Sequence, residues 1–159
     1  MNLLDEHVGL TFVEDQTSTG ENKMNLSGVL IGTENPDKLK DYYTKLFGKP
    51  TWDEGGYFGW LIGTGAMTFG PHDQVKGKNT SPGRIIWNIE AEDVKAEFAK
   101  LKAAGATVVK EPYQMSEEPG MDGWISTFAD PDNNYFQLMS HMEMPTEADK
   151  STADVGARA

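Results

Sequence analysis

The sequence carries one pattern twice, and this repetition restricts the folds that the chain can adopt. Residues 37–48 and residues 92–102, about 55 positions apart, both place apolar side chains at the spacing of an amphipathic helix. A short apolar run precedes each helix pattern, at 29–31 and at 85–87, and a glycine follows each. Because a solenoid needs three or more copies to bury its core, two copies predict one paired domain. Two similar halves that face each other form a cleft, which is where small-molecule sites usually lie.

Three short runs with strand character follow each helix pattern, and glycine-rich turns separate them. These runs lie at 51–52, 57–62 and 66–69 in the first half and at 107–109, 124–128 and 135–139 in the second half. Asn35 is predicted to cap the first helix, with Pro36 at the first helical position. Each half is therefore predicted to contain a strand, a helix and three further strands, in the order βαβββ.

Changes in composition near both ends of the chain predict the domain boundaries. Residues 1–24 form an N-terminal extension with a single apolar patch. Residues 142–159 are mostly small and polar, which predicts a disordered tail. The folded domain spans residues 25–141, and its two modules cover about residues 25–75 and 83–141.

The net charge of −11 is concentrated partly at the two ends of the chain. Residues 1–24 hold five acidic side chains against one lysine, and residues 141–159 hold four acidic side chains against two basic ones. The body of the chain is therefore an ordinary acidic globule. Binding to a phosphate backbone needs clustered Lys and Arg, so nucleic acid is not expected as a partner.

The cellular compartment is predicted from features that the sequence lacks. The 159 residues include no cysteine, and the first residues have neither the basic start nor the apolar stretch of a signal peptide. No run approaches the roughly 20 apolar residues that span a bilayer. We therefore expect a cytoplasmic protein with no disulfide, no thiolate zinc site and no membrane partner.

The most specific motif lies before the last predicted strand. Residues 128–134, Phe-Ala-Asp-Pro-Asp-Asn-Asn, resemble the "DP-D/E-GN" turn of the vicinal oxygen chelate superfamily, and the Tyr42-Tyr43 pair ahead of Gly48 is similar to its "FY…LG" motif. This superfamily contains glyoxalase I, extradiol dioxygenases, fosfomycin-resistance proteins and bleomycin-binding proteins. The resemblance covers about residues 26–141. It implies an α+β fold in which two βαβββ modules form a curved mixed β-sheet around a cleft.

The enzymes of this superfamily hold one metal with a His or Gln on the first strand of each half and a Glu, Gln or His on a late strand. In this chain the resemblance places the first position at Ser27 or Gly28 and its counterpart at Arg84, a permanent cation. Residues 57–71 contain no Asp, Glu, His or Gln, so only Gln137 offers a side chain able to bind a metal. We therefore expect no metal and no other cofactor. The expected function is the binding of a small molecule in the cleft between the modules.

The candidates for lining this cleft are mainly aromatic residues on predicted strands, although such residues commonly belong to the core. Arg84 is a candidate anchor for a carboxylate or phosphate group, with a surface salt bridge as the alternative. His72 is either a pocket or catalytic residue or part of a solvated loop. The predicted ligand pocket comprises Tyr57, Trp60, Arg84, Trp87, Trp124, Gln137 and His72.

Two other functions remain open. One is a lyase, isomerase or dioxygenase that holds one divalent metal with a non-standard set of ligands drawn from His72, Gln137, Glu54 and Glu90. The other is an interaction module whose own aromatic side chains fill the cleft. No catalytic residue is assigned. The exposed edges of the predicted sheets are compatible with a monomer and with a symmetric homodimer.

Overall fold

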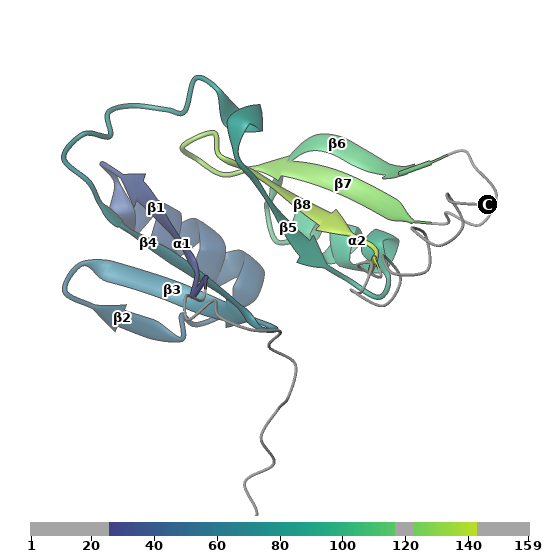
Figure 1. Cartoon of the computed structure of the whole chain (residues 1–159), viewed down its shortest axis with the longest axis horizontal. Helices are drawn as coiled ribbons and strands as arrows, with labels where there is room; N and C mark the ends of the chain where they lie inside the picture. Colours follow the sequence, from purple (N-terminus) through teal and green to yellow (C-terminus); the bar gives the residue numbers. More distant parts are fainter. Residues whose placement is uncertain (1–25, 117–122, 143–159) are drawn as a thin grey trace, which may run out of the picture.

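The computed structural model describes residues 26–116 and 123–142, which form two modules side by side (Figure 1). The first module contains β1 (Val29–Thr33), α1 (Pro36–Phe47), β2 (Trp52–Glu54), β3 (Tyr57–Ile62) and β4 (Gly65–Pro71). The second contains β5 (Ile86–Glu90), α2 (Val94–Ala103), β6 (Thr107–Gln114), β7 (Trp124–Ala129) and β8 (Tyr135–Met139). A long connection, which includes the 3-10 turn η1 (Pro82–Arg84), joins β4 to β5.

The two modules have the same sheet topology. The strand order is β1-β4-β3-β2 in the first sheet and β5-β8-β7-β6 in the second. In each sheet the first strand is parallel to its neighbour and the other pairs are antiparallel. The predicted α+β fold of two βαβββ modules is confirmed. The strands are divided between two four-stranded sheets, and β1 and β5 are edge strands of those sheets.

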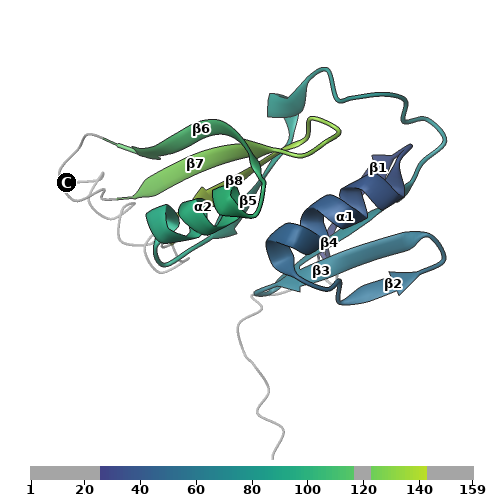
Figure 2. The same ribbon diagram turned by 180° about the vertical axis from the view of Figure 1, so that it is seen from behind.

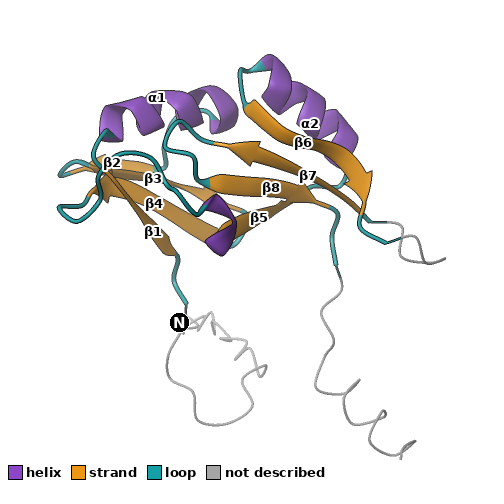
Figure 3. Ribbon diagram, turned by 90° about the horizontal axis from the view of Figure 1, so that it is seen from above, coloured by secondary structure: helices purple, strands orange, loops and turns teal. Residues whose placement is uncertain are grey.

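Both helices lie on the same side of the strand layer (Figure 3). Seen from behind, α1 covers β3 and β4, and α2 covers the strands of the second sheet (Figure 2). One cross-strand phenylalanine pair is stacked under each helix. The ring centroids of Phe58 and Phe69 are 5.6 Å apart, and those of Phe128 and Phe136 are 5.2 Å apart. Burial of such side chains contributes about 1.5–3 kcal/mol each.

Tyr43 of α1 joins the two modules into one core. Its side chain is fully buried, and its ring contacts Phe69 of the first sheet at 4.6 Å between centroids. The same ring lies 5.7 Å from Trp87 and 6.0 Å from Phe136 of the second sheet. Because one side chain packs on both sheets, the hydrophobic core is continuous across the modules.

The two helices begin differently. Asp93 accepts a hydrogen bond from the backbone N–H of Ala96 at 3.0 Å and so caps α2. Asn35 occupies the N-cap position of α1 and Pro36 the first helical position, as predicted, but the Asn35 side chain makes no capping hydrogen bond. Its backbone N–H instead donates to Thr33 Oγ1 at 2.9 Å, which fixes the turn between β1 and α1.

The predicted N-terminal extension, residues 1–24, lies outside the described residues, as does nearly all of the predicted tail. Within residues 26–116 and 123–142, none of the helices has the length and apolar character required to cross a bilayer.

Candidate functional site

A groove between the modules opens into two cavities. The edge strands β1 and β5 supply its walls, and Val29 and Trp87 line both cavities. The first, here named the linker cavity, has a volume of about 580 Å³ and is bordered by residues 74–81 of the connection between the modules. The second, the hairpin cavity, has a volume of about 670 Å³ and lies against the β3–β4 turn. Both volumes are in the usual range for small-molecule sites.

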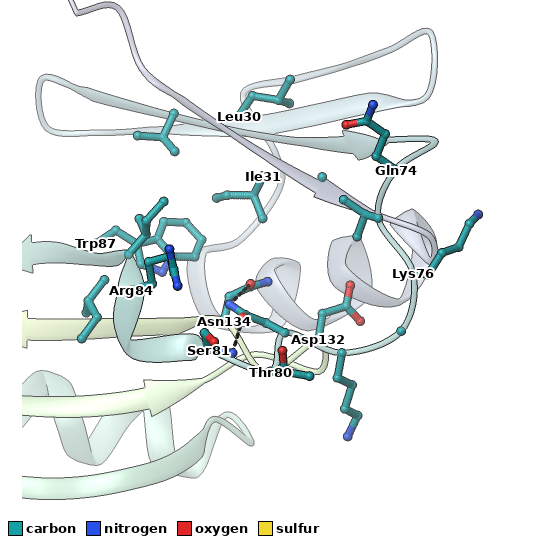
Figure 4. Close-up of a pocket in the computed structure, with 18 residues that line it drawn as sticks. Leu30, Ile31, Gln74, Lys76, Thr80, Ser81, Arg84, Trp87, Asp132 and Asn134 are labelled. Atoms are coloured by element: carbon teal, nitrogen blue, oxygen red, sulfur yellow. Dashed lines mark hydrogen bonds between the residues drawn. The ribbon is translucent and has the colours of Figure 1, made fainter.

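The linker cavity combines an apolar wall with a polar rim. Leu30 and Ile31 of β1 and Ile86 and Trp87 of β5 supply its apolar lining. The Trp87 ring is held in place because its inner side packs on Phe69, with 5.4 Å between centroids. Figure 4 shows polar side chains such as Ser81 and Asn134 along one side of this wall. Apolar surface with a few directed polar groups is typical of a ligand pocket.

Asn79 ties the connection between the modules to the β7–β8 turn. Its backbone N–H donates to the carbonyl of Asp132 at 2.7 Å, and its own carbonyl accepts from Asn133 Nδ2 at 2.7 Å. Its side-chain Nδ2 donates to Asn134 Oδ1 at 3.1 Å, while its Oδ1 accepts from the backbone N–H of Ser81 at 2.8 Å. With all of these groups engaged, Asn79 holds the connection over the linker cavity.

The β7–β8 turn is built around Asp130, which is 5% exposed. Its Oδ1 accepts from the backbone N–H groups of Asp132 at 2.9 Å and Asn134 at 2.8 Å. Its Oδ2 accepts from Asn134 Nδ2 at 2.9 Å and from Tyr43 O–H at 3.1 Å. Burial raises the pKa of Asp130, and the hydrogen bonds from Asn134 and Tyr43 oppose that rise. The motif that carries the family resemblance thus joins α1 to the second module.

Two neighbouring groups extend this joint. Thr33 Oγ1 donates to Asp132 Oδ2 at 2.5 Å, and Tyr42 O–H donates to the carbonyl of Ala129 at 3.0 Å. Burial raises the pKa of Tyr42 to about 12 and that of Tyr43 well above its ordinary value. These polar groups form hydrogen bonds within the protein, and their role is therefore structural.

Of the seven residues predicted to form the pocket, Arg84 and Trp87 line the linker cavity. Arg84 ends the η1 turn, where its backbone N–H donates to the carbonyl of Ser81 at 3.0 Å. In Figure 4 the Arg84 guanidinium lies beside Trp87 and is turned toward the cavity. The structure therefore brings one cation and one large aromatic ring together at this site.

Two of the predicted tryptophans lie elsewhere. Trp60 belongs to the core, because it faces α1, is 3% exposed and donates from Nε1 to the carbonyl of Gly48 at 3.0 Å. Trp124 packs partly against the core at the start of β7, and Lys95 Nζ lies 3.4 Å from its ring centroid. Neither side chain lines the linker cavity or the hairpin cavity.

The other three predicted residues lie on the side of the sheets away from the helices or in the connection. Tyr57 is 40% exposed, and its ring covers Gly70. His72 is exposed near Gly32, with its Nδ1 3.4 Å from Asp73 Oδ1. Gln137 donates from Nε2 to Thr127 Oγ1 at 2.9 Å. None of the three lines either cavity.

The strand register determines which residue lies beside Gln137, the position predicted to keep a metal-binding side chain. Gln137 pairs with Asn88 in the parallel pairing of β8 with β5. Arg84 precedes β5 because Pro82 starts a turn there. Ser27 and Gly28 line the hairpin cavity just before β1. Among the residues that the structure describes, no three His, Asp or Glu side chains gather into a group that could hold a metal ion.

Several residues of the linker cavity were missed at the sequence level. Leu30 belongs to the short aliphatic run at 29–31 that predicted a strand, and in the structure it is 56% exposed and borders the cavity. Lys76, Lys78 and Asn79 come from a loop whose composition indicates only a turn. The alternation of β1 could have assigned Leu30 to the face opposite the helix, whereas the path of the loop depends on contacts with the distant β7–β8 turn.

Comparison with known proteins supports the fold and its family. A model of the glyoxalase-like domain matches residues 28–139. An uncharacterized protein of Mycolicibacterium smegmatis is 30% identical over 90 residues, which cover 57% of this chain and 75% of that protein.

Solved structures share the architecture at low sequence identity. A conserved domain protein superposes with a TM-score of 0.61 at 20% identity, covering 75% of this chain and 100% of the other. A glyoxalase/bleomycin resistance protein/dioxygenase from Alicyclobacillus acidocaldarius gives a TM-score of 0.60 at 16% identity, with 78% and 96% covered. A family enzyme of the same description from Burkholderia phytofirmans PsJN gives 0.56 at 20% identity, with 75% and 100% covered. These likenesses concern the fold alone.

Proposed function

The chain belongs to the glyoxalase-like domain family, and from this premise we propose that it binds a small molecule in the linker cavity without a catalytic metal. The proposal depends on one observation above all: the cavity has an apolar wall of Leu30, Ile31, Ile86 and Trp87 on two different modules. A ligand lying there contacts both modules at once.

The exposed part of this wall favours a ligand site over a filled cleft. Leu30 is 56% exposed and Ile85, at the cavity rim, is 72% exposed. Exposed aliphatic side chains grouped at a concave site typically mark a binding surface. The rival idea that aromatic residues fill the cleft is less well supported, because Trp60 lies in the core and Trp124 lines neither cavity.

Metal-free binding is favoured by the residues at and beside the predicted ligand position Gln137. Asn88 and Gln137 are neutral amides, and Gln137 already donates to Thr127. Carbonyl oxygens of this kind are weak ligands when no carboxylate or imidazole joins them. Of the four ligand candidates considered above, Glu90 lines the hairpin cavity, whereas Glu54, His72 and Gln137 line neither cavity.

A ligand screen monitored by melting temperature tests the proposal. A ligand at a hundredfold excess over its dissociation constant stabilises the folded state by about 2.7 kcal/mol, so a diverse metabolite panel should contain compounds that raise the melting temperature. Leu30→Trp should fill the linker cavity and remove this increase. Leu61→Trp is the matched control, because Leu61 is 58% exposed and lines neither cavity. A panel that leaves the melting temperature unchanged would count against small-molecule binding.

A metal-dependent enzyme is the second candidate, and one contact favours it. Glu90 Oε2 lies 2.9 Å from His141 Nδ1, which brings two metal-binding side-chain types together at the end of the second sheet. This alternative predicts stoichiometric Ni, Zn, Fe or Mn in protein purified without chelator, and activity that chelator removes and metal restores. Protein without bound metal would leave binding as the function.

A further inference from the structure

The linker cavity carries an excess of positive charge in an acidic protein. Lys76, Lys78 and Arg84 all line it, whereas the whole chain has a net charge of −11. No ion pair of these three side chains exists within residues 26–116 and 123–142. Several cationic side chains at a concave surface raise the local concentration of anionic ligands.

The acidic residue in the cavity lining does not neutralise this charge by direct contact. Asp132 is 7% exposed, and its Oδ2 accepts the hydrogen bond from Thr33 Oγ1 at 2.5 Å. Its carboxylate is therefore engaged in the joint between the modules. The guanidinium of Arg84 is left available for a ligand.

The connection between the modules presents Arg84 in a defined position. Asn79 fixes the connection to the β7–β8 turn, and its Oδ1 accepts from the backbone N–H of Ser81 at 2.8 Å. Ser81 in turn accepts from the backbone N–H of Arg84 at 3.0 Å through its carbonyl. Figure 4 shows Arg84 turned toward the cavity and Lys76 extending away from it. Arg84 is thus placed for direct contact, and Lys76 contributes to the field around it.

We propose that the linker cavity binds an organic oxyanion, with its carboxylate or phosphate group on Arg84 and its apolar body against Leu30, Ile31 and Trp87. The inference rests on the proposed function and assigns its ligand class. The Arg84 guanidinium can donate hydrogen bonds to two oxygens of a carboxylate or phosphate at once. A ligand with a neutral or cationic head group cannot form this charged, two-point contact. The apolar wall adds affinity for a flat or branched hydrocarbon body.

Calorimetric titration with three probes of one ring system tests the ligand class. Naphthoate and naphthyl phosphate carry the two candidate oxyanions, and naphthamide is the neutral control. We expect at least one of the two anions to bind about tenfold more tightly than naphthamide, because a hydrogen bond to a charged partner is stronger than one to a neutral partner. The tighter of the two anions identifies the preferred head group. Since Arg84 is exposed, this preference should weaken as salt is added.

Three variants assign the effect to Arg84. Arg84→Gln should weaken anion binding about five- to tenfold and leave naphthamide binding unchanged. Arg84→Lys should weaken anion binding less, because lysine keeps the positive charge but cannot form the two-point contact of a guanidinium. Lys45→Gln removes an exposed charge on α1, away from the cavity, and should change nothing. Melting curves of all three variants should match the parent protein.

The outcomes separate this inference from the proposed function. Equal affinity for naphthamide and the anions, unaffected by Arg84→Gln, would overturn the anion preference and leave small-molecule binding intact. Binding of none of the three probes would contradict the proposed function itself.

Discussion

The two sheets have closely similar sides under the helices and different sides away from them. On the first sheet, the outer side has glycines covered by aromatic rings: Trp52 lies over Gly59, and Tyr57 lies over Gly70. On the second sheet, the outer side has a row of polar residues across all four strands. The strand pairing aligns Asn88, Gln137, Thr127 and Lys110 in that row.

The sides under the helices differ much less. Each contains a stacked phenylalanine pair on neighbouring strands, and each helix supplies a large apolar residue to it, Tyr43 from α1 and Phe98 from α2. Packing under a helix tolerates little change in volume, whereas a side without a covering helix is free to change. The duplicated sequence pattern therefore reflects the shared packing under the helices. The two modules differ in the residues on the outer sides of their sheets and in the groove.

The largest expected effect tests whether one hydrophobic core extends under both helices. Phe69→Ala and Phe136→Ala should each lower the free energy of unfolding by about 3–5 kcal/mol, since both remove a fully buried ring. Because Tyr43 contacts both rings, urea unfolding of either variant should remain a single transition. Separate unfolding of the two modules would refute a continuous core.

The next effect concerns the joint between the modules. Asp130→Asn should cost about 2–4 kcal/mol, because an amide donor would face the donors Tyr43 O–H and Asn134 Nδ2 in a buried site. Tyr43→Phe, which removes one donor and leaves the carboxylate with its remaining partners, is the milder comparison. Urea denaturation measures both variants. An Asp130→Asn variant as stable as the parent would show that the hydrogen bonds of Asp130 do not stabilise the contact between the modules.

A smaller effect should distinguish the outer sides of the two sheets. Gly59→Ala should cost about 1–3 kcal/mol, because the added Cβ would overlap the Trp52 ring and the Met67 carbonyl. Asn88→Ala changes an exposed residue of the polar row and should stay within about 0.5 kcal/mol. Equal losses in thermal unfolding would show that the two sides are not organised differently.

The smallest effect is a dependence on alkaline pH. Burial holds the pKa of Tyr42 at about 12 against an ordinary value of 10.0, so the folded state keeps a proton that the unfolded state releases. Stability should therefore be complete below pH 10 and fall as the pH rises toward 12. Tyr42→Phe should make this decline shallower in urea titrations across that range. An unchanged slope would mean that Tyr42 does not contribute to it.

Much of the fold could be predicted because its signals are local. Alternating apolar residues between glycine-rich turns located β3, β4, β7 and β8, and the two amphipathic patterns located both helices. The prediction of where β5 starts was less accurate. The apolar residue Ile85 suggested a strand from that point, but Pro82 directs the chain into η1 and the strand begins at Ile86.

The site was harder to predict because it depends on neighbours that are distant in sequence. Trp60 and Trp87 both lie on strands and both face the helices. β3 is an inner strand, so Trp60 is covered, whereas β5 is an edge strand, so Trp87 borders the groove. The position of Arg84 likewise depends on the bonds between Asn79 and the β7–β8 turn. Periodicity contains no information on either relationship.

The most direct test of the central claim is a calorimetric titration of naphthoate into protein that has been treated with excess chelator. The account predicts saturable binding to a single site, with the same affinity before and after treatment, and loss of that binding in Leu30→Trp but not in Leu61→Trp. Binding that appears only after a divalent metal is added would contradict metal-free recognition in the linker cavity.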